Sequence, residues 1–133
     1  MKVFLVLFSV CLAAVMAQQI SDIQKETLRE NRDACITETG ADRAEVDNAY
    51  KNEWVDNEKL RCFALCLLKK WKMMDDQGKL DETMARERMG KVMPPAKVDE
   101  LMTKCKDLKG SNPCETGYMM MKCYTGNIAP AAV

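Results

Sequence analysis

Apolar side chains recur at intervals of three, four and seven residues along most of this chain, which is the spacing of one face of an α-helix. The pattern is fullest over residues 56–72, where Leu60, Phe63, Leu67 and Trp71 follow one another at these intervals. Apolar residues cover more than half of that helix's circumference, so we expect it to lie at the centre of the fold. No stretch shows sustained alternation of apolar and polar residues, and the sequence therefore predicts an all-α protein.

Capping and turn residues divide the chain into about six helices. The predicted helices run from residue 21 or 22 to about 35, from the Asp42 cap to about 50, and over about 56–72, 82–89, 96–108 and 114–124. A short apolar tail, Ile128 to Val133, follows the last helix. We expect this tail either to cover the mouth of a pocket or to be disordered.

The first 17 residues have the order of charged, apolar and small residues that is typical of a secretory signal peptide. Lys2 is the positive charge, residues 3–14 are the apolar core, and Ala17 is the small residue before the cleavage point. A membrane anchor needs about 18 to 20 apolar residues, and Gln18 closes this stretch too early. We therefore expect a secreted, soluble protein that begins at Gln18 and does not insert into membranes.

The charge balance of the mature chain excludes one large class of partner. Residues 18–133 carry 19 basic and 20 acidic side chains, because cleavage removes only Lys2 from the totals of the full chain. Nucleic-acid binding needs a basic face, which this composition does not indicate. A chain of this length folds as a single domain, here residues 18–133, and buries about two thirds of its unfolded surface.

Six cysteines remain after the leader, an even number in a protein expected to enter an oxidising compartment, so three disulfides are predicted. Fifteen pairings are formally allowed. Cys62 and Cys66 lie one turn apart on one helix with nearly parallel Cα–Cβ vectors, and Cys114 and Cys123 lie about 13 Å apart along another helix. Excluding these two bonds leaves ten pairings, each of which ties the helix of Cys62 and Cys66 to two other places in the chain.

Several kinds of chemistry are missing from the sequence. The chain has no histidine, so the mechanisms that depend on a serine–histidine or cysteine–histidine pair are excluded. A zinc site would need four cysteines or carboxylates, whereas the six cysteines of the mature chain are expected to form disulfides. A calcium loop around Gly78 fails because Met73 and Met84 occupy the positions of its first and last ligands. We expect no metal, no cofactor and no enzymatic activity.

Nine of the 11 methionines follow the leader, and seven or eight of them fall on the predicted inward faces of the last three helices and the turns beside them. Methionine is flexible and polarisable, so a cavity lined by it adapts to guests of different shapes. Periodicity alone favours the alternative, in which these side chains fill an ordinary core. The expected disulfides count in favour of the cavity, because their stabilisation of about 2 to 4 kcal/mol each can offset the cost of an unfilled interior.

The cysteine spacing carries a resemblance to a known family. Successive cysteines are separated by 26, 3, 38, 8 and 8 residues, in the order Cys35, Cys62, Cys66, Cys105, Cys114 and Cys123. This pattern, together with segments 35–40, 60–66 and 76–80, resembles the six-cysteine insect odorant-binding proteins, the pheromone-binding and general odorant-binding family. The likeness extends over essentially the whole mature chain.

The resemblance implies a compact bundle of about six helices around an apolar pocket, with interlocked disulfides Cys35–Cys66, Cys62–Cys114 and Cys105–Cys123. It also implies a secreted carrier that binds small hydrophobic molecules such as odorants or pheromones without a covalent step and delivers them to membrane chemoreceptors. Some members are carriers in non-sensory tissues. A secreted helical signalling protein or inhibitor, acting through a surface patch, is the alternative from another class.

The inward residues of the predicted helices are the candidate ligand contacts. They are Leu60, Phe63, Leu67, Met84, Met89, Val98, Leu101, Met102, Tyr118, Met119, Met120 and Tyr124. Tyr118 or Tyr124 is expected to offer one hydrogen bond to a carbonyl or hydroxyl group of the guest. The protein partners considered are a membrane chemoreceptor and a second copy in a weak homodimer. Without histidine, binding is expected to be nearly flat between about pH 7 and pH 5.5.

Overall fold

A computed structural model describes residues 26–127 of the chain. The described residues from 34 onward belong to one compact unit, which contains α2 to α6 and the end of the helix before them. The described residues contain a helix that ends at residue 39, followed by α2 (Arg43–Tyr50), α3 (Glu58–Lys70), α4 (Glu82–Gly90), α5 (Pro95–Cys105) and α6 (Pro113–Gly126). There is no β-strand in this part of the chain; one isolated bridge joins Met74 and Leu80. The predicted all-α fold is confirmed.

Three predicted features lie outside the described residues. They are the signal peptide over residues 1–17, the start of the first helix at Ser21 or Asp22, and the tail from Ile128 to Val133.

Side chains that accept backbone hydrogen bonds start four of the five labelled helices. Asp42, Asn57, Asp81 and Asn112 each accept from the N–H three residues further on, at 2.9 to 3.1 Å. The helix α5 instead begins with Pro95, whose fixed φ and missing N–H suit a first helical position. These caps explain why the predicted helix starts are close to the observed ones.

Some predicted boundaries were wrong by one to four residues. The central helix begins after the Asn57 cap and not at Asp56, whose carboxylate pairs with Arg61 at 2.6 Å. The helix α6 begins one residue earlier than predicted, since Pro113 occupies its first turn behind the Asn112 cap. The fifth helix ends at Cys105 and not at Leu108, and the first continues to residue 39, where Gly40 with a φ of 70° stops it.

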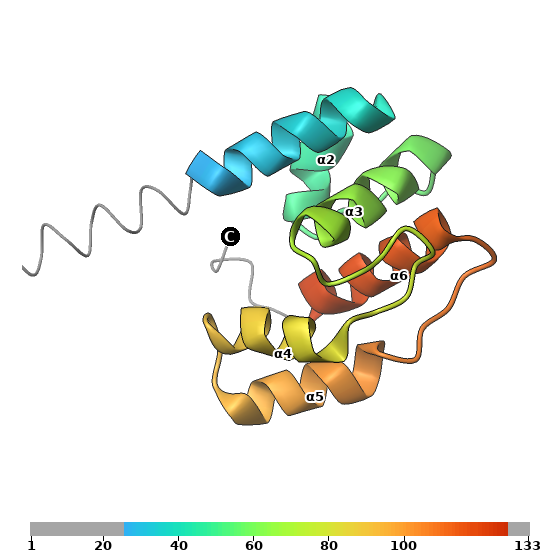
Figure 1. Cartoon of the computed structure of the whole chain (residues 1–133). Coiled ribbons are helices and arrows are strands. Elements are labelled where there is room, and N and C mark those ends of the chain that lie inside the picture. The colour runs from blue at the N-terminus through green and yellow to red at the C-terminus, as the bar shows by residue number, and fades with distance from the viewer. Residues whose placement is uncertain (1–25, 128–133) are drawn as a thin grey trace, which may run out of the picture. The chain divides into compact units, whose positions relative to one another are not determined.

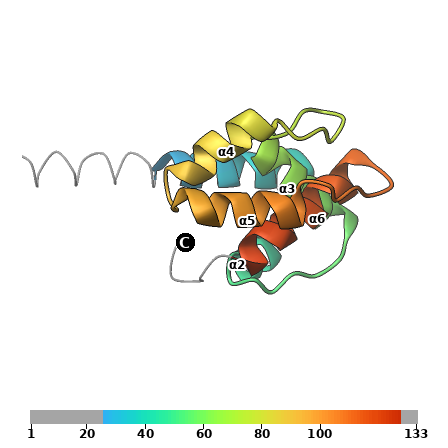
Figure 2. The same cartoon turned by 90° about the horizontal axis from the view of Figure 1, so that it is seen from below.

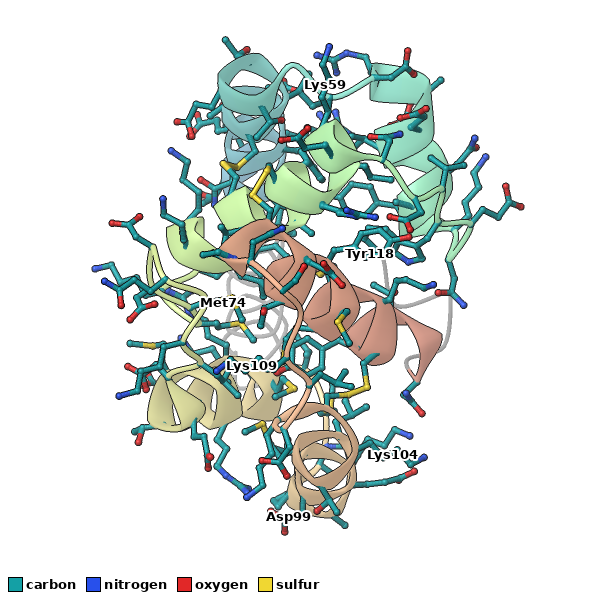
Figure 3. The ribbon with its side chains drawn as sticks, turned by 90° about the vertical axis from the view of Figure 1, so that its right-hand side faces the viewer. Lys59, Met74, Asp99, Lys104, Lys109 and Tyr118 are labelled. Atoms are coloured by element: carbon teal, nitrogen blue, oxygen red, sulfur yellow. A yellow bond between two sulfur atoms is a disulfide. The ribbon has the colours of Figure 1, made fainter. Side chains whose placement is uncertain are left out.

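The helix α3 is the most deeply buried element, as the apolar pattern predicted. Seven of its 13 residues are buried, and Leu60, Phe63 and Leu68 are among the largest fully buried side chains of the described protein. In Figures 1 and 3, α3 and α6 lie side by side, with α2 on one side of them and the α4–α5 pair on the other. Figure 2 shows α4 and α5 running next to each other, joined by the short turn before Pro95.

Gly117 lets the backbones of α3 and α6 approach each other. A Cβ atom at position 117 would lie 2.8 Å from the Cα atom of Leu65 and 2.9 Å from its Cβ atom. Both are too close for any side chain larger than hydrogen, and neither neighbour is the end of a flexible group. The contact between the two helices therefore depends on glycine at this position.

Three disulfides cross-link the helices of this unit, and Figure 3 shows them in yellow. Cys62–Cys114 joins α3 to α6, and Cys105–Cys123 joins α5 to α6. Cys35–Cys66 joins the helix that ends at residue 39 to α3, with Cα atoms 5.7 Å apart. These are the pairs implied by the resemblance, so both cysteines of α3 bond to other helices.

Replacing Gly117 with alanine should lower the free energy of unfolding by about 1 to 3 kcal/mol, because the new methyl group meets the Leu65 backbone and forces the helices apart. Gly90→Ala is the matched control: it is also helical, and a Cβ atom there would meet nothing within 4 Å. This control should be neutral or stabilise the protein by up to about 1 kcal/mol. Urea unfolding with the disulfides intact measures both; equal effects of the two substitutions would contradict the close contact.

Replacing Cys62 and Cys114 together with alanine should lower the free energy of unfolding by about 4 kcal/mol, since the disulfide closes a loop of 52 residues in the unfolded chain. The measurement is urea unfolding of the purified double variant beside the wild type. A loss below about 1 kcal/mol would show that packing between α3 and α6 holds the two helices together without the cross-link.

Candidate functional site

The predicted ligand contacts gather in one buried apolar cluster. Ten of the 12 candidates belong to it, and they come from α3, α4, α5 and α6. The ten are Leu60, Phe63, Leu67, Met89, Val98, Leu101, Met102, Tyr118, Met120 and Tyr124. Met84 and Met119 are half-buried and do not belong to the cluster. Four helices thus supply one continuous apolar interior, and which of its side chains touch a guest stays a prediction.

Methionine is unusually frequent in this interior. Six methionines within residues 26–127 are buried, namely Met73, Met74, Met89, Met102, Met120 and Met121. The candidate contacts omitted Met73, Met74 and Met121. The first two lie in the turn after α3, where the Asp81 N–H donates to the Met73 carbonyl at 2.8 Å and Met74 pairs with Leu80. Helical periodicity could not identify them because they lie outside any helix, although the sequence does predict a turn beside them.

Tyr118 is held by the segment that leads into α3. Its hydroxyl donates to the Val55 carbonyl at 3.2 Å, and its ring meets the edge of Trp54 with centroids 5.5 Å apart. The Trp54 indole N–H donates to Thr125 Oγ1 at 3.1 Å, and Lys122 Nζ lies 5.5 Å from the centre of the Tyr118 ring. Figure 3 shows Tyr118 on α6, facing this segment. Burial raises the pKa of Tyr118, so its phenol keeps the proton that it donates.

Tyr124 lies one turn and a half further along α6, in a different environment. Its hydroxyl donates to the sulfur of Met120 at 3.6 Å. Burial raises the pKa of Tyr124 to about 12, and the negative charge of Glu82 acts in the same direction. The two tyrosines named as candidate hydrogen-bond donors therefore differ: one donates to a backbone carbonyl and the other to a thioether.

One group of side chains has the spacing of a metal site. Ligand atoms of Cys35, Glu38 and Cys66 lie within 4.8 Å of one another. The two sulfur atoms are bonded to each other, so neither is the thiolate that a metal needs, and Glu38 also pairs with Lys70 at 2.9 Å. This group is a disulfide beside a surface ion pair.

Within residues 26–127, no helix is both long and apolar enough to cross a membrane.

Comparison with known proteins finds a family that covers most of the chain. The model of the PBP/GOBP family matches residues 17–127. General odorant-binding protein 56a of Drosophila melanogaster is 30% identical over 118 residues, which cover 86% of this chain and 83% of that protein. The family match over residues 17–127 spans all six predicted disulfide cysteines and the buried cluster.

Two solved structures have the same fold. A fatty acid binding protein from the oral disk of the blowfly Phormia regina is similar at a TM-score of 0.65 and 23% identity, over 78% of this chain and 90% of that one. Odorant Binding Protein 7 from Anopheles gambiae, in complex with an azo compound, is similar at a TM-score of 0.64 and 25% identity, over 79% and 85% of the two chains. These two structures share the fold of the chain. The match over residues 17–127 and the Drosophila relative show that the chain belongs to the PBP/GOBP family, the insect odorant-binding proteins.

Proposed function

We propose that this protein is a secreted carrier that reversibly binds small hydrophobic molecules in its methionine-rich interior and releases them unchanged. The observation that carries the proposal is membership of the odorant-binding family over residues 17–127, whose members are carriers of small hydrophobic ligands and not enzymes. Delivery to a membrane chemoreceptor belongs to the same proposal. The weak homodimer stays a prediction.

The composition of the interior supports a carrier with broad selectivity. Six buried methionines, each with three rotatable side-chain bonds, let the cluster rearrange around guests of different shapes. A pocket with mainly apolar walls distinguishes guests that differ by one methylene by only about 1 to 3 kcal/mol. The disulfides between helices support the same function, because they stabilise the fold without requiring every part of the interior to be filled.

The structural relatives bind guests of different kinds. The blowfly relative is described as a fatty acid binding protein, and the mosquito relative was solved with an azo compound. A hydrophobic guest of modest size is the class that these two descriptions share. For this chain we infer that class and no particular member of it.

Two features of the N-terminus support secretion. Residues 1–17 have the pattern of a signal peptide, and the family match begins at residue 17, where cleavage is expected. Three disulfides also suit an oxidising, extracellular compartment.

Purified protein should bind an apolar fluorescent probe, and small hydrophobic guests should displace it. A guest of about 12 non-hydrogen atoms that gains about 0.5 kcal/mol for each atom has a Kd between tens of micromolar and about 1 µM. Probe fluorescence titration measures the affinity, and native mass spectrometry detects co-purified lipid. Protein that binds neither probe nor lipid, and instead captures one protein partner, would contradict the carrier and support a signalling protein.

A pair of core substitutions tests where the guest binds. Met102→Ala in α5 removes a candidate ligand contact and should change probe affinity at least about threefold, because the lost side chain reshapes the cavity wall. Val46→Ala in α2 removes a fully buried side chain outside the candidate set and should change stability but not affinity. Parallel probe titrations and urea unfolding separate the two effects. Equal changes in affinity would show that both act through general loosening of the fold.

Probe affinity should be nearly flat between about pH 7 and pH 5.5, since the chain contains no histidine. The carboxyl groups with a lowered pKa and the tyrosines with a raised pKa titrate outside this range. Hydrogen bonds or ion pairs lower the pKa values of Asp56, Glu100 and Glu115 from their ordinary values of 3.8, 4.5 and 4.5. The stabilisation that accompanies a lowered carboxyl pKa is present above the unfolded pKa and is lost as the pH falls through the folded one, so losses begin below about pH 4.5.

The protein should also lose stability at high pH, because of a buried tyrosine. Since burial raises the pKa of Tyr124 to about 12, the folded state keeps its phenol proton more tightly than the unfolded state does. The resulting stabilisation is complete below about pH 10 and is lost as the pH rises toward 12. Probe titration across pH 4 to 11 tests both limits. A large loss of affinity between pH 7 and pH 5.5 would contradict the prediction.

A further inference from the structure

Tyr124 holds a buried hydrogen-bond donor that lacks a good acceptor in the described protein. The residue is 5% exposed, and the only acceptor found for its hydroxyl within residues 26–127 is the Met120 sulfur at 3.6 Å. A thioether sulfur is a weak acceptor compared with an oxygen atom. A buried hydroxyl that is poorly paired raises the free energy of the protein, so an oxygen atom brought to this place would be bound favourably.

Tyr118 does not offer the same opportunity. Its hydroxyl donates to the Val55 carbonyl oxygen at 3.2 Å, which is a strong acceptor. A guest that used this donor would have to break the bond between α6 and the segment before α3. The two tyrosines are six residues apart, or about 120° around the helix axis, so they face different surroundings.

The burial of Tyr124, which is the larger effect, and a negative charge nearby restrict the kind of acceptor. Glu82, at the start of α4, is the charged group that acts on the Tyr124 phenol, and its negative charge helps to keep that phenol protonated. A carboxylate guest at the same hydroxyl would lie in this negative field and would lose its hydration on burial. A neutral oxygen atom, as in a ketone, aldehyde or ester, has neither cost.

We propose that the Tyr124 hydroxyl recognises a neutral oxygen acceptor, such as the carbonyl group of a ketone or ester, on an otherwise apolar guest. The inference rests on the proposed carrier function and names the substrate class of its interior. Binding of such a guest transfers the hydroxyl hydrogen bond from the Met120 sulfur to the carbonyl oxygen, while the apolar chain of the guest packs among the methionines. The guest is held without a covalent bond and is released unchanged.

The test compares three guests of one chain length, namely a straight-chain methyl ketone, the alkane and the carboxylic acid. Displacement of an apolar naphthylamine fluorophore gives the Kd of each at pH 7. Tyr124→Phe removes one oxygen atom and should weaken ketone binding about 3- to 10-fold, the effect of losing one neutral hydrogen bond. Alkane binding should stay within about twofold of the wild type, because the apolar contacts are kept.

Two further variants make the test specific. Tyr118→Phe is the matched control: it removes the same atom from the other tyrosine and should leave the preference between ketone and alkane unchanged. Met120→Leu keeps the volume but removes the competing sulfur, so ketone binding should stay equal or become stronger. In the wild type, the carboxylic acid should bind more weakly at pH 7 than the uncharged methyl ketone.

The outcomes separate this inference from the carrier function. If all three guests displace the probe but Tyr124→Phe weakens ketone and alkane equally, the inference is wrong and the carrier function stands. If Tyr118→Phe alone removes the ketone preference, the donor is Tyr118 and the inference is also wrong. If no guest displaces the probe from the wild type, the carrier function itself fails. Thermal unfolding of each variant shows that it is folded before its affinity is compared.

Discussion

The close contact between α3 and α6 is the constraint on which the rest of the described fold depends. Gly117 allows the two backbones to approach, and Cys62–Cys114 then fixes the pair covalently. The other two disulfides each start from one of these helices: Cys66 of α3 bonds to Cys35, and Cys123 of α6 bonds to Cys105 of α5. Every disulfide within residues 26–127 therefore includes at least one member of this pair.

This arrangement fixes the helices in place while the interior between them keeps adaptable side chains. Where α3 meets α6, Gly117 lies directly against the Leu65 backbone, and this close packing holds the two helices together. The buried methionines come from the turn after α3 and from α4, α5 and α6, and methionine packs adaptably and specifies its neighbours poorly. A core built only of methionine would not specify one structure. Three disulfides between the helices keep them in place even where the methionine side chains adapt.

The helices could be predicted from sequence because their signals are local. Asp42, Asp81 and Asn112 cap helices through bonds to residues three positions away, and the apolar spacing of α3 is visible in its own residues. The errors occurred where two local signals competed, as at Asp56 and Asn57. The cysteine pairing, by contrast, depends on which helices meet in space: geometry left ten pairings, and only the family resemblance selected one. The role of Gly117 had no sequence signal, because it depends on the position of Leu65 in another helix.

The same limit explains why the sequence could not distinguish the two tyrosines of α6. Both lie on an apolar helix and both carry a phenol, so composition and periodicity treat them alike. They differ in their acceptors: the Tyr118 hydroxyl donates to the Val55 carbonyl in the segment before α3, whereas the Tyr124 hydroxyl donates to the sulfur of Met120 on its own helix. A backbone carbonyl outside a helix needs a donor and finds one in Tyr118, which ties α6 to the chain before α3. Within residues 26–127 the acceptor of the Tyr124 hydroxyl is the Met120 sulfur, so this buried donor is left for the neutral oxygen atom of the guest proposed above.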